Sequence, residues 1–210
     1  MNILVLDPAA SCGYCLLKVE DKVANIYEYG FIDIGESEFV GDRCIYLMDK
    51  IEQMLVSHSI THVAVEDYFF SSRFATGSDV NVAFRTAIYI KCRQHKIDYQ
   101  ILSVSGWKKF IAGRSTPSKA QKLKWGKAPA KKLMIQEALY QKYKIRFPNH
   151  SISEKTQKPI KFRTDIVDAV AQAIYYCRLY LDIQEVKSSM SIPEDVDIKT
   201  LFNYGDYDAN

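Results

Sequence analysis

Four acidic residues stand where the fold of the chain could bring them together. Asp7 ends the apolar run that opens the chain, and Glu66 ends a second apolar run, so both are predicted strand-end residues. Asp165 and Asp168 are three positions apart in a predicted helix, which places their side chains on one face. Carboxylates that converge repel one another unless a cation joins them, and Mg²⁺ prefers oxygen ligands of this kind. Because paired ions can activate a water and stabilise a leaving oxygen, the four acids predict phosphodiester chemistry.

Each acid also has a simpler interpretation when it is considered alone. Asp165 and Asp168 stand at the start of their helix, where carboxylates stabilise the positive end of the helix dipole. Asp7 suits a turn that ends a strand. The prediction of a site therefore depends on the four acids together with the predicted topology.

Basic residues are concentrated in one third of the chain. The net charge is only +3, yet residues 99–136 contain nine basic side chains and no acidic one. This segregation favours binding of a polyanion, because each neutralised phosphate releases counterions; a solvated basic face without a ligand is the alternative. Trp107, Phe110 and Trp125 lie among these lysines, and their rings are expected to suit bases or sugars. The basic residues predicted to contact nucleic acid are Lys108, Lys109, Arg114, Lys119, Lys122, Lys124, Lys127 and Lys131.

The five cysteines predict neither a disulfide framework nor a zinc site. They are odd in number and scattered along the chain. Cys12 and Cys15 form a C-x-x-C pair, but this pair leads into a predicted strand, where residues three apart point to opposite faces. Because no second cluster of cysteine and histidine completes a zinc site, ordinary packing of free thiols is expected.

Hydrophobic periodicity predicts an α/β domain. Residues 2–7, 13–20 and 24–34 have the pattern of three strands in an antiparallel meander. The later strands alternate with helices, so right-handed crossovers must make them parallel, in a mixed five-stranded sheet with helices on both faces. The other predicted elements are a helix at 39–58, a strand at 62–66, a helix at 79–95 with Ser78 as its cap, a strand at 99–104, a short helix at 105–112, a helix at 128–143 and a last helix from Thr164 to Leu181.

The predicted domain spans residues 1–181. Residues 182–210 are acidic and are expected to form a loosely ordered tail, and residues 148–163 are expected to be a long loop. No apolar run approaches the roughly 18–20 residues that span a bilayer, and the N-terminus lacks the basic start of a signal or transit peptide. The protein is therefore expected to act in the cytoplasm or the nucleoplasm, with no membrane partner.

Four stretches of the sequence together have the character of family motifs. They are Asp7-Pro8 with Gly13-Tyr14; Val65-Glu66-Asp67-Tyr68-Phe69; the basic run 126–132 with the helix after it; and Arg163-Thr164-Asp165-Ile166-Val167-Asp168-Ala169-Val170-Ala171. These stretches resemble motifs of the RuvC family of Holliday-junction resolvases, which are nucleases with an RNase H-like fold. The resemblance extends over residues 2–181 and is weak between the motifs.

The resemblance implies a structure-selective endodeoxyribonuclease that resolves four-way DNA junctions by two-metal-ion hydrolysis. It assigns two Mg²⁺ ions, for which Mn²⁺ can substitute, to the four acids. It also assigns Lys132, with Lys131 as the second choice, to the developing charge near the scissile phosphate. Phe69, with Tyr68 and Arg73 in the same segment, is expected to contact DNA at the junction centre, and ordinary core packing is the alternative for Phe69.

The resemblance also implies a homodimer, because a four-way junction has two equivalent strands to cut. The predicted helix at 79–95, with Val82, Ala83, Ala87 and Ile88, is expected to form part of the interface. The chain departs from the family in having Ala9 where the first motif has glycine, in the interval 148–163, which looks like an insertion, and in its longer C-terminal end. Such departures are typical of divergent members from phages and other viruses.

Two other kinds of function fit the same residues. One is a broader branched-DNA or flap nuclease, or an RNase H-type enzyme, because one scaffold supports many activities. The other is a non-catalytic junction-binding protein whose carboxylates are structural. Digestion of four-way, Y-shaped, linear and hybrid substrates distinguishes these functions.

Overall fold

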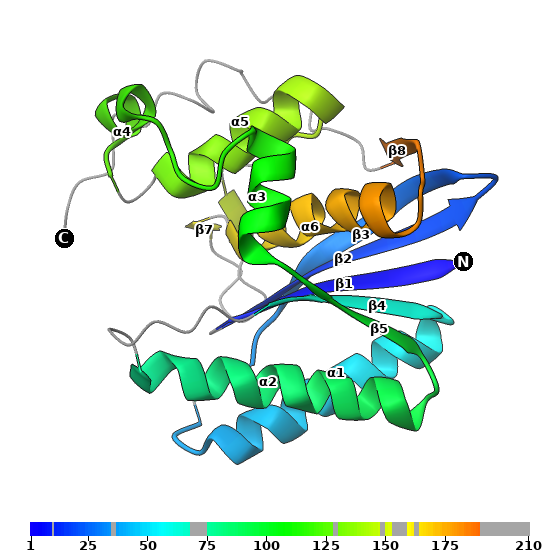
Figure 1. Cartoon of the computed structure of the whole chain (residues 1–210). Coiled ribbons are helices and arrows are strands. Elements are labelled where there is room, and N and C mark those ends of the chain that lie inside the picture. Colours follow the sequence, from blue (N-terminus) through cyan, green and yellow to red (C-terminus); the bar gives the residue numbers. More distant parts are fainter. Residues whose placement is uncertain are drawn as a thin grey trace.

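A six-stranded sheet forms the centre of the protein, with helices on both faces (Figure 1). The computed structural model describes residues 1–9, 11–34, 37–67, 75–127, 130–147, 150–152, 159–161 and 164–189. The strand order is β5-β4-β1-β2-β3-β8. The first three strands are antiparallel and β4 and β5 run parallel to β1, which confirms the predicted mixed sheet. The strands are β1 (Asn2–Pro8), β2 (Cys12–Glu20), β3 (Val23–Ile32), β4 (His62–Glu66), β5 (Asp98–Leu102) and β8 (Glu185–Ser188).

The sixth strand, β8, was not predicted. It pairs in parallel with β3, and Ser189 adds a backbone hydrogen bond to Ile26 of the same strand. Without β8, β3 would leave a row of unpaired backbone groups at the sheet edge. The pairing therefore depends on the exposed edge of β3, and the short, charged sequence of β8 carries no strand pattern of its own. Residues 182–189 of the expected tail thus belong to the folded domain.

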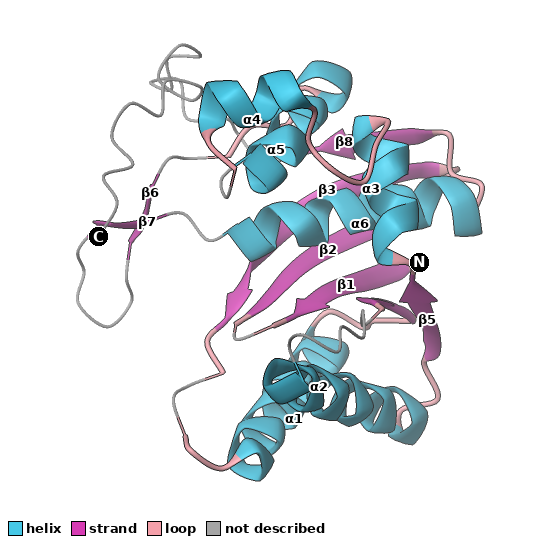
Figure 2. Cartoon of the chain, turned by 60° about the vertical axis from the view of Figure 1, so that its left-hand side comes forward, coloured by secondary structure: helices cyan, strands magenta, loops and turns pink. Residues whose placement is uncertain are grey.

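The helices form one layer on each face of the sheet (Figure 2). Helices α1 and α2 lie together on one face, and α3, α5 and α6 cover the other. Helix α2 begins one turn earlier than predicted, so Ser78 lies inside the helix. The helices are α1 (Val40–Ser57), α2 (Ala75–Gln94), α3 (Val104–Ala112), α4 (Lys119–Trp125), α5 (Ala130–Tyr143) and α6 (Thr164–Tyr180).

Two segments predicted as loops contain regular structure. Helix α4 lies in the basic segment, and it begins with a capping box in which Ser118 and Gln121 exchange side-chain and backbone hydrogen bonds. Trp125, at its C-terminal end, packs with Ala130 and Leu133 of α5. In the interval 148–163, β6 (His150–Ile152) and β7 (Pro159–Lys161) pair as a separate antiparallel hairpin.

Strand alternation divides the core between the two faces. Ile3 and Val5 of β1 pack in the cluster beneath α6, whereas Leu4 and Leu6 pack in the cluster over α1 and α2. Because successive side chains of a strand point to opposite faces, Asp7 continues the row that faces α6.

The cysteines behave as ordinary packing residues. Cys12 and Cys15 are free and buried, and they belong to the clusters on opposite faces of the sheet. The C-x-x-C pair therefore cannot bring its thiols together. Among the helices that the structure describes, none has the length and apolar character needed to cross a bilayer.

Candidate active site

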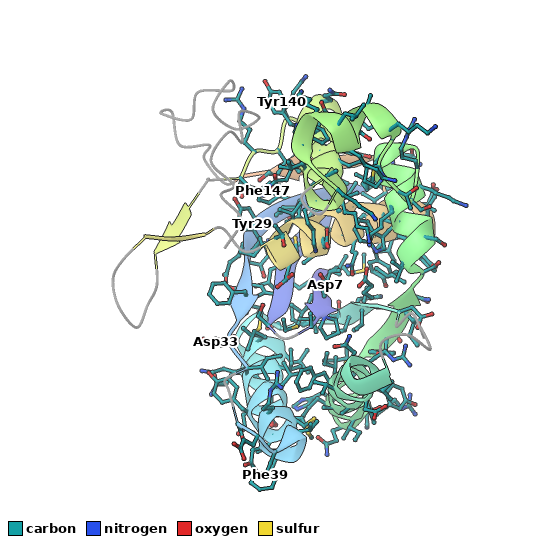
Figure 3. All side chains as sticks on the ribbon, turned by 90° about the vertical axis from the view of Figure 1, so that its left-hand side faces the viewer. Asp7, Tyr29, Asp33, Phe39, Tyr140 and Phe147 are labelled. Carbon is teal, nitrogen blue, oxygen red and sulfur yellow. The ribbon has the colours of Figure 1, made fainter. Side chains whose placement is uncertain are left out.

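The first two acids meet because β1 and β4 are neighbouring parallel strands. Leu6 pairs with Val65, so Asp7 and Glu66 follow at the same end of the sheet. Ala64 packs in the cluster beneath α6, and Glu66, two residues later, shares its face of the strand. The carboxyl groups of Asp7 and Glu66 lie near enough that each shifts the pKa of the other. Figure 3 shows Asp7 between the sheet and the start of α6.

Gly13 allows the third and fourth acids to approach. It pairs with Asp7 across β1 and β2, and a Cβ atom on it would lie 2.3 Å from the backbone oxygen of Asp165. Only glycine therefore lets the first turn of α6 lie directly on β2 at this point. The sequence motif contained Gly13, but its packing role becomes visible only when α6 is in place.

The acids of α6 differ in their surroundings. Asp168 is only 4% exposed, and burial raises its pKa despite the opposing charge of Lys132. Asp165 is partly exposed and accepts a hydrogen bond from the hydroxyl of Ser11 at 2.7 Å. Ser11 is a second contact that sequence reasoning did not identify, since nothing in its local sequence links it to residue 165.

The pKa of Asp7 shows the effect of burial and of repulsion within the cluster most clearly. Burial raises the pKa of Asp7 well above its ordinary value, and the carboxylates of Glu66 and Asp168 raise it further. Burial also raises the pKa of Glu66. Hydrogen bonding with Asp7, the positive charge of Lys108 and the hydrogen bond from Trp107 act in the opposite direction and lower it. The cluster therefore has more negative groups than the protein compensates, which favours binding of an additional cation.

Lys132 provides compensating charge from α5. Its ammonium donates a short hydrogen bond to Oδ2 of Asp168 and lies 3.9 Å from Oδ1 of Asp165. Burial lowers the pKa of Lys132, but the attraction of Asp168, Asp7 and Asp165 outweighs burial and raises it, so the amine stays charged. Lys131, the second choice, is exposed. The structure thus brings Lys132 to the acids.

The oxygen ligands are chemically suited to a hard divalent cation. Within the described part of the chain, Oδ1 of Asp168 is buried and has no hydrogen-bond partner, so its lone pairs are available to a cation. In this structure, however, no three His, Cys, Asp or Glu side chains of the described residues lie close enough to one another to hold a metal ion together. The Lys132 ammonium pairs with Asp168 at this position. Metal binding would therefore require Lys132 to release Asp168 and the acids to draw together.

The predicted DNA contacts fall into three groups. Lys108 is partly buried and acts electrostatically on Glu66 and Asp168, so it lies near the acids. Tyr68, Phe69 and Arg73 lie outside the described residues. The remaining basic residues are all exposed, from α3 through α4 to the start of α5, and they are Lys109, Arg114, Lys119, Lys122, Lys124, Lys127 and Lys131.

The aromatic residues of the basic segment do not face solvent as expected. Trp107 is fully buried and Trp125 is 6% exposed. Phe110 packs edge-to-face against Tyr175 of α6. The expectation that these rings would contact bases or sugars is therefore not met by Trp107 and Trp125, because their apolar area is used to attach α3 and α4 to the domain. Trp107 has a further contact, a hydrogen bond of 2.7 Å from its indole Nε1 to Oε1 of Glu66.

The predicted interface face of α2 was also partly wrong. Ala87 and Ile88 are buried in the protein's own core, with Phe84, whereas Val82, Tyr89 and Ile90 are exposed. The exposed apolar side of α2 therefore includes Val82 as predicted, but Tyr89 and Ile90 in place of Ala87 and Ile88.

Comparison with known proteins gives consistent matches. The sequence model for crossover junction endodeoxyribonuclease RuvC matches residues 3–128. The RuvC of Sulfurovum sp. (strain NBC37-1) is 32% identical over 126 residues, which cover 58% of this chain and 76% of that protein. The RuvC of Wolinella succinogenes is 31% identical over 123 residues, which cover 58% of this chain and 75% of that protein.

Solved structures share the fold. The structure of T. thermophilus RuvC in complex with Holliday junction substrate has a TM-score of 0.60 at 16% identity, over 86% of this chain and 94% of that one. The yeast mitochondrial Holliday junction resolvase Ydc2 has a TM-score of 0.57 at 16% identity, over 87% of this chain and 80% of that one. The predicted RNase H-like fold is thus confirmed. With more than half of the sequence matched by the family model, this chain belongs to the RuvC family of crossover junction endodeoxyribonucleases.

Proposed function

We propose that this protein is a Mg²⁺-dependent endonuclease that resolves four-way DNA junctions. The observation that carries the proposal is the convergence of Asp7, Glu66, Asp165 and Asp168 beside the ammonium of Lys132. Carboxylates with only a structural role would not need to lie beside other carboxylates, because each added like charge destabilises the folded chain. The four acids would hold the two ions, and Mn²⁺ would serve in place of Mg²⁺.

The residues of the site have separable roles in phosphodiester hydrolysis. When bound, the ions supply an activated water and stabilise the leaving oxygen. Lys132 is placed to stabilise negative charge that develops on the scissile phosphate. Ser11 orients Asp165 through its hydrogen bond. Lys108, between the acids and the basic surface, would attract the phosphate next to the cut.

Two observations favour a DNA junction over other phosphate esters. The exposed basic residues from Lys109 to Lys131 offer many phosphate contacts, as binding to a large nucleic acid requires. The similar T. thermophilus RuvC was solved with a Holliday junction substrate. We expect the protein to act on DNA in the cytoplasm of a bacterium or of an infected host cell, and Tyr68, Phe69 and Arg73 remain the proposed contacts at the junction centre.

A twofold homodimer is the proposed working form. Val82, Tyr89 and Ile90 of α2 expose apolar area in positions that lie within two turns of one another, on one side of the helix. A pair of copies related by a twofold axis would present two active sites to the two equivalent strands of a junction.

A cleavage assay with Asp7→Asn tests the function. Wild type is expected to cut a four-way junction in Mg²⁺ and to leave it intact in EDTA. Asp7→Asn is expected to bind the junction with wild-type affinity and to lose cleavage by at least about 10³-fold, because the variant keeps the size of the side chain and loses a metal-ligating charge. Y-shaped, linear and RNA–DNA hybrid substrates, digested in parallel, measure the selectivity. Cleavage retained by Asp7→Asn would contradict the proposed site, and equal cutting of all substrates would favour a broader nuclease.

A further inference from the structure

We propose that the indole of Trp107 fixes the orientation of the Glu66 carboxylate and thereby sets how tightly the acidic cluster binds its metal ions. Trp107 is thus a positioning residue that acts through Glu66. The inference rests on the proposed function, because Glu66 is a metal ligand only there.

The hydrogen bond itself is short and shielded from water. Nε1 of Trp107 donates to Oε1 of Glu66 at 2.7 Å, and the two residues are 41 positions apart in the chain. The Trp107 side chain has no exposed area, so water cannot replace Glu66 as the hydrogen-bond acceptor of its N–H. An indole N–H that is buried without a partner destabilises a protein, which favours keeping this hydrogen bond.

The fold holds both partners from independent directions. Glu66 pairs with Leu102 of β5, and the amide of Asp67 donates to the Leu102 oxygen at 2.7 Å, which fixes the end of β4. Ser103 follows immediately and caps α3, so Trp107 comes one turn into a helix that starts at the end of β5.

Helix α3 is also docked closely on α6. A Cβ atom on Gly106 would lie 2.7 Å from the hydroxyl oxygen of Tyr175, so glycine permits this approach. The indole therefore belongs to the same buried layer as α6, the helix that carries Asp165 and Asp168. A hydrogen bond from such a layer restricts the rotation of the Glu66 carboxylate.

The chemistry of the donor suits a metal ligand. An indole N–H only donates, so it occupies one lone pair of Glu66 without competing for the cation. A carboxyl group held in this way loses less conformational entropy when an ion binds. Partners that orient metal ligands typically change metal affinity by about 10–100-fold when they are removed.

The experiment measures Mn²⁺ binding without DNA, by calorimetry and by electron paramagnetic resonance, and then the metal dependence of junction cleavage. Trp107→Phe retains an aromatic ring and removes the N–H. We expect about 10-fold weaker Mn²⁺ binding, a matching increase in the metal concentration that gives half-maximal cleavage, and recovery of most of the wild-type rate at saturating metal. Junction affinity in EDTA is expected to remain that of wild type.

Trp125→Phe is the matched control within the same chain. Trp125 is also buried, but among the residues that the structure describes its Nε1 has no hydrogen-bond partner. The same chemical change there removes no hydrogen bond to an acid, so Mn²⁺ affinity is expected to stay at the wild-type value. Site-specific replacement of Trp107 by β-(3-benzothienyl)alanine, which has nearly the shape of tryptophan and no N–H, covers the case in which Trp107→Phe fails to fold.

The outcomes separate this inference from the proposed function. Equal Mn²⁺ affinity in wild type and in the folded Trp107 variants would overturn the role of Trp107 and leave the nuclease proposal intact. A wild-type protein that binds no Mn²⁺ and cuts no junction would overturn both. A cleavage loss that saturating metal does not restore would also contradict the inference, because it would indicate general damage to the site.

Discussion

Charge balance at single residues decides what this site can do. Asp7, Glu66 and Asp168 are all acids whose pKa burial raises, and Lys132 is the cation in direct contact with Asp168. Such an arrangement is stable only if a proton or a cation compensates the remaining charge. Binding of a cation at this site would therefore be expected to stabilise the folded protein.

Substitution of Lys131 and of Lys132, which are neighbours in α5, is expected to affect different kinetic parameters of cleavage. Lys132→Met removes the cation that contacts Asp168, so the maximal rate of junction cleavage is expected to fall on the order of 10²-fold. Lys131 is exposed, so Lys131→Met is expected to raise mainly the junction concentration needed for half-maximal rate. Steady-state cleavage of both variants in saturating Mg²⁺ measures the two effects. The assignment of Lys132 would be wrong if the two variants showed the same pattern.

At the scale of elements, the site depends on how closely α6 lies on the sheet. The helix is buried along most of its length, and its small residues Ala169, Ala171 and Ala173 all lie in the core. Gly13 sets the distance at the end that carries Asp165. A small displacement of this helix would separate Asp168 from Asp7 and so disrupt the site, even though no charged residue of the sequence would be changed.

Gly13→Ala is expected to destabilise the protein and to reduce cleavage. The added methyl group would meet the backbone of Asp165 at 2.3 Å, and overpacking of this kind costs about 1–3 kcal/mol. Thermal unfolding and the cleavage rate measure both effects.

Gly41→Ala is the control for Gly13→Ala. No described residue has an atom within 4 Å of a Cβ atom at this position in α1, and alanine favours a helix by up to about 1 kcal/mol over glycine. Its midpoint of unfolding is expected to stay the same or rise. Equal midpoints for wild type and Gly13→Ala would contradict the proposed close approach of α6 to β2.

At the scale of the whole molecule, the proposed DNA-binding surface and the proposed active site are neighbours. The acids lie between β1, β4 and α6, and the exposed lysines follow along α3, α4 and α5 on the same side of the sheet (Figure 1). Helix α4 extends this basic surface beyond the core, to which Trp125 attaches it.

Charge reversal on α4 is expected to weaken junction binding without abolishing cleavage of bound DNA. Lys122→Glu with Lys124→Glu removes exposed cations, and the slope of log Kd against log salt concentration is expected to fall by about 0.9 for each phosphate that the protein no longer neutralises. Lys22→Glu with Lys96→Glu makes the same change in net charge at exposed positions outside the basic segment, and serves as the control. If both pairs reduced affinity equally, the basic surface would have no specific role.

Dimer formation through α2 is expected to depend on its exposed apolar side. Ile90→Asp places a charge on this side and is expected to yield a monomer by analytical ultracentrifugation, with loss of paired cuts in one junction. Ile45→Asp, on the exposed surface of α1, is the control and should leave the wild-type mass unchanged. A monomeric wild type, or a dimer that survives Ile90→Asp, would contradict the proposed interface.

Local sequence patterns predicted five of the six strands of the sheet and the strand-end positions of two of the acids. Alternating apolar residues predicted β1 to β5, and the same alternation places Asp7 and Glu66 on one face because strand side chains have a period of two. Helical spacing placed Asp165 and Asp168 together. These features depend on local periodicity, which any short stretch of the chain reveals.

Contacts between distant segments became visible only in the folded chain. Lys132 reaches Asp168 across 36 positions, Trp107 reaches Glu66 across 41, and β8 pairs with β3 at the far edge of the sheet. Lys131 and Lys132 are chemically alike, and a tryptophan among lysines suits DNA as well as a core. The direction in which each side chain points depends on how α3 and α5 pack on α6, because packing of distant elements has no signature in local sequence.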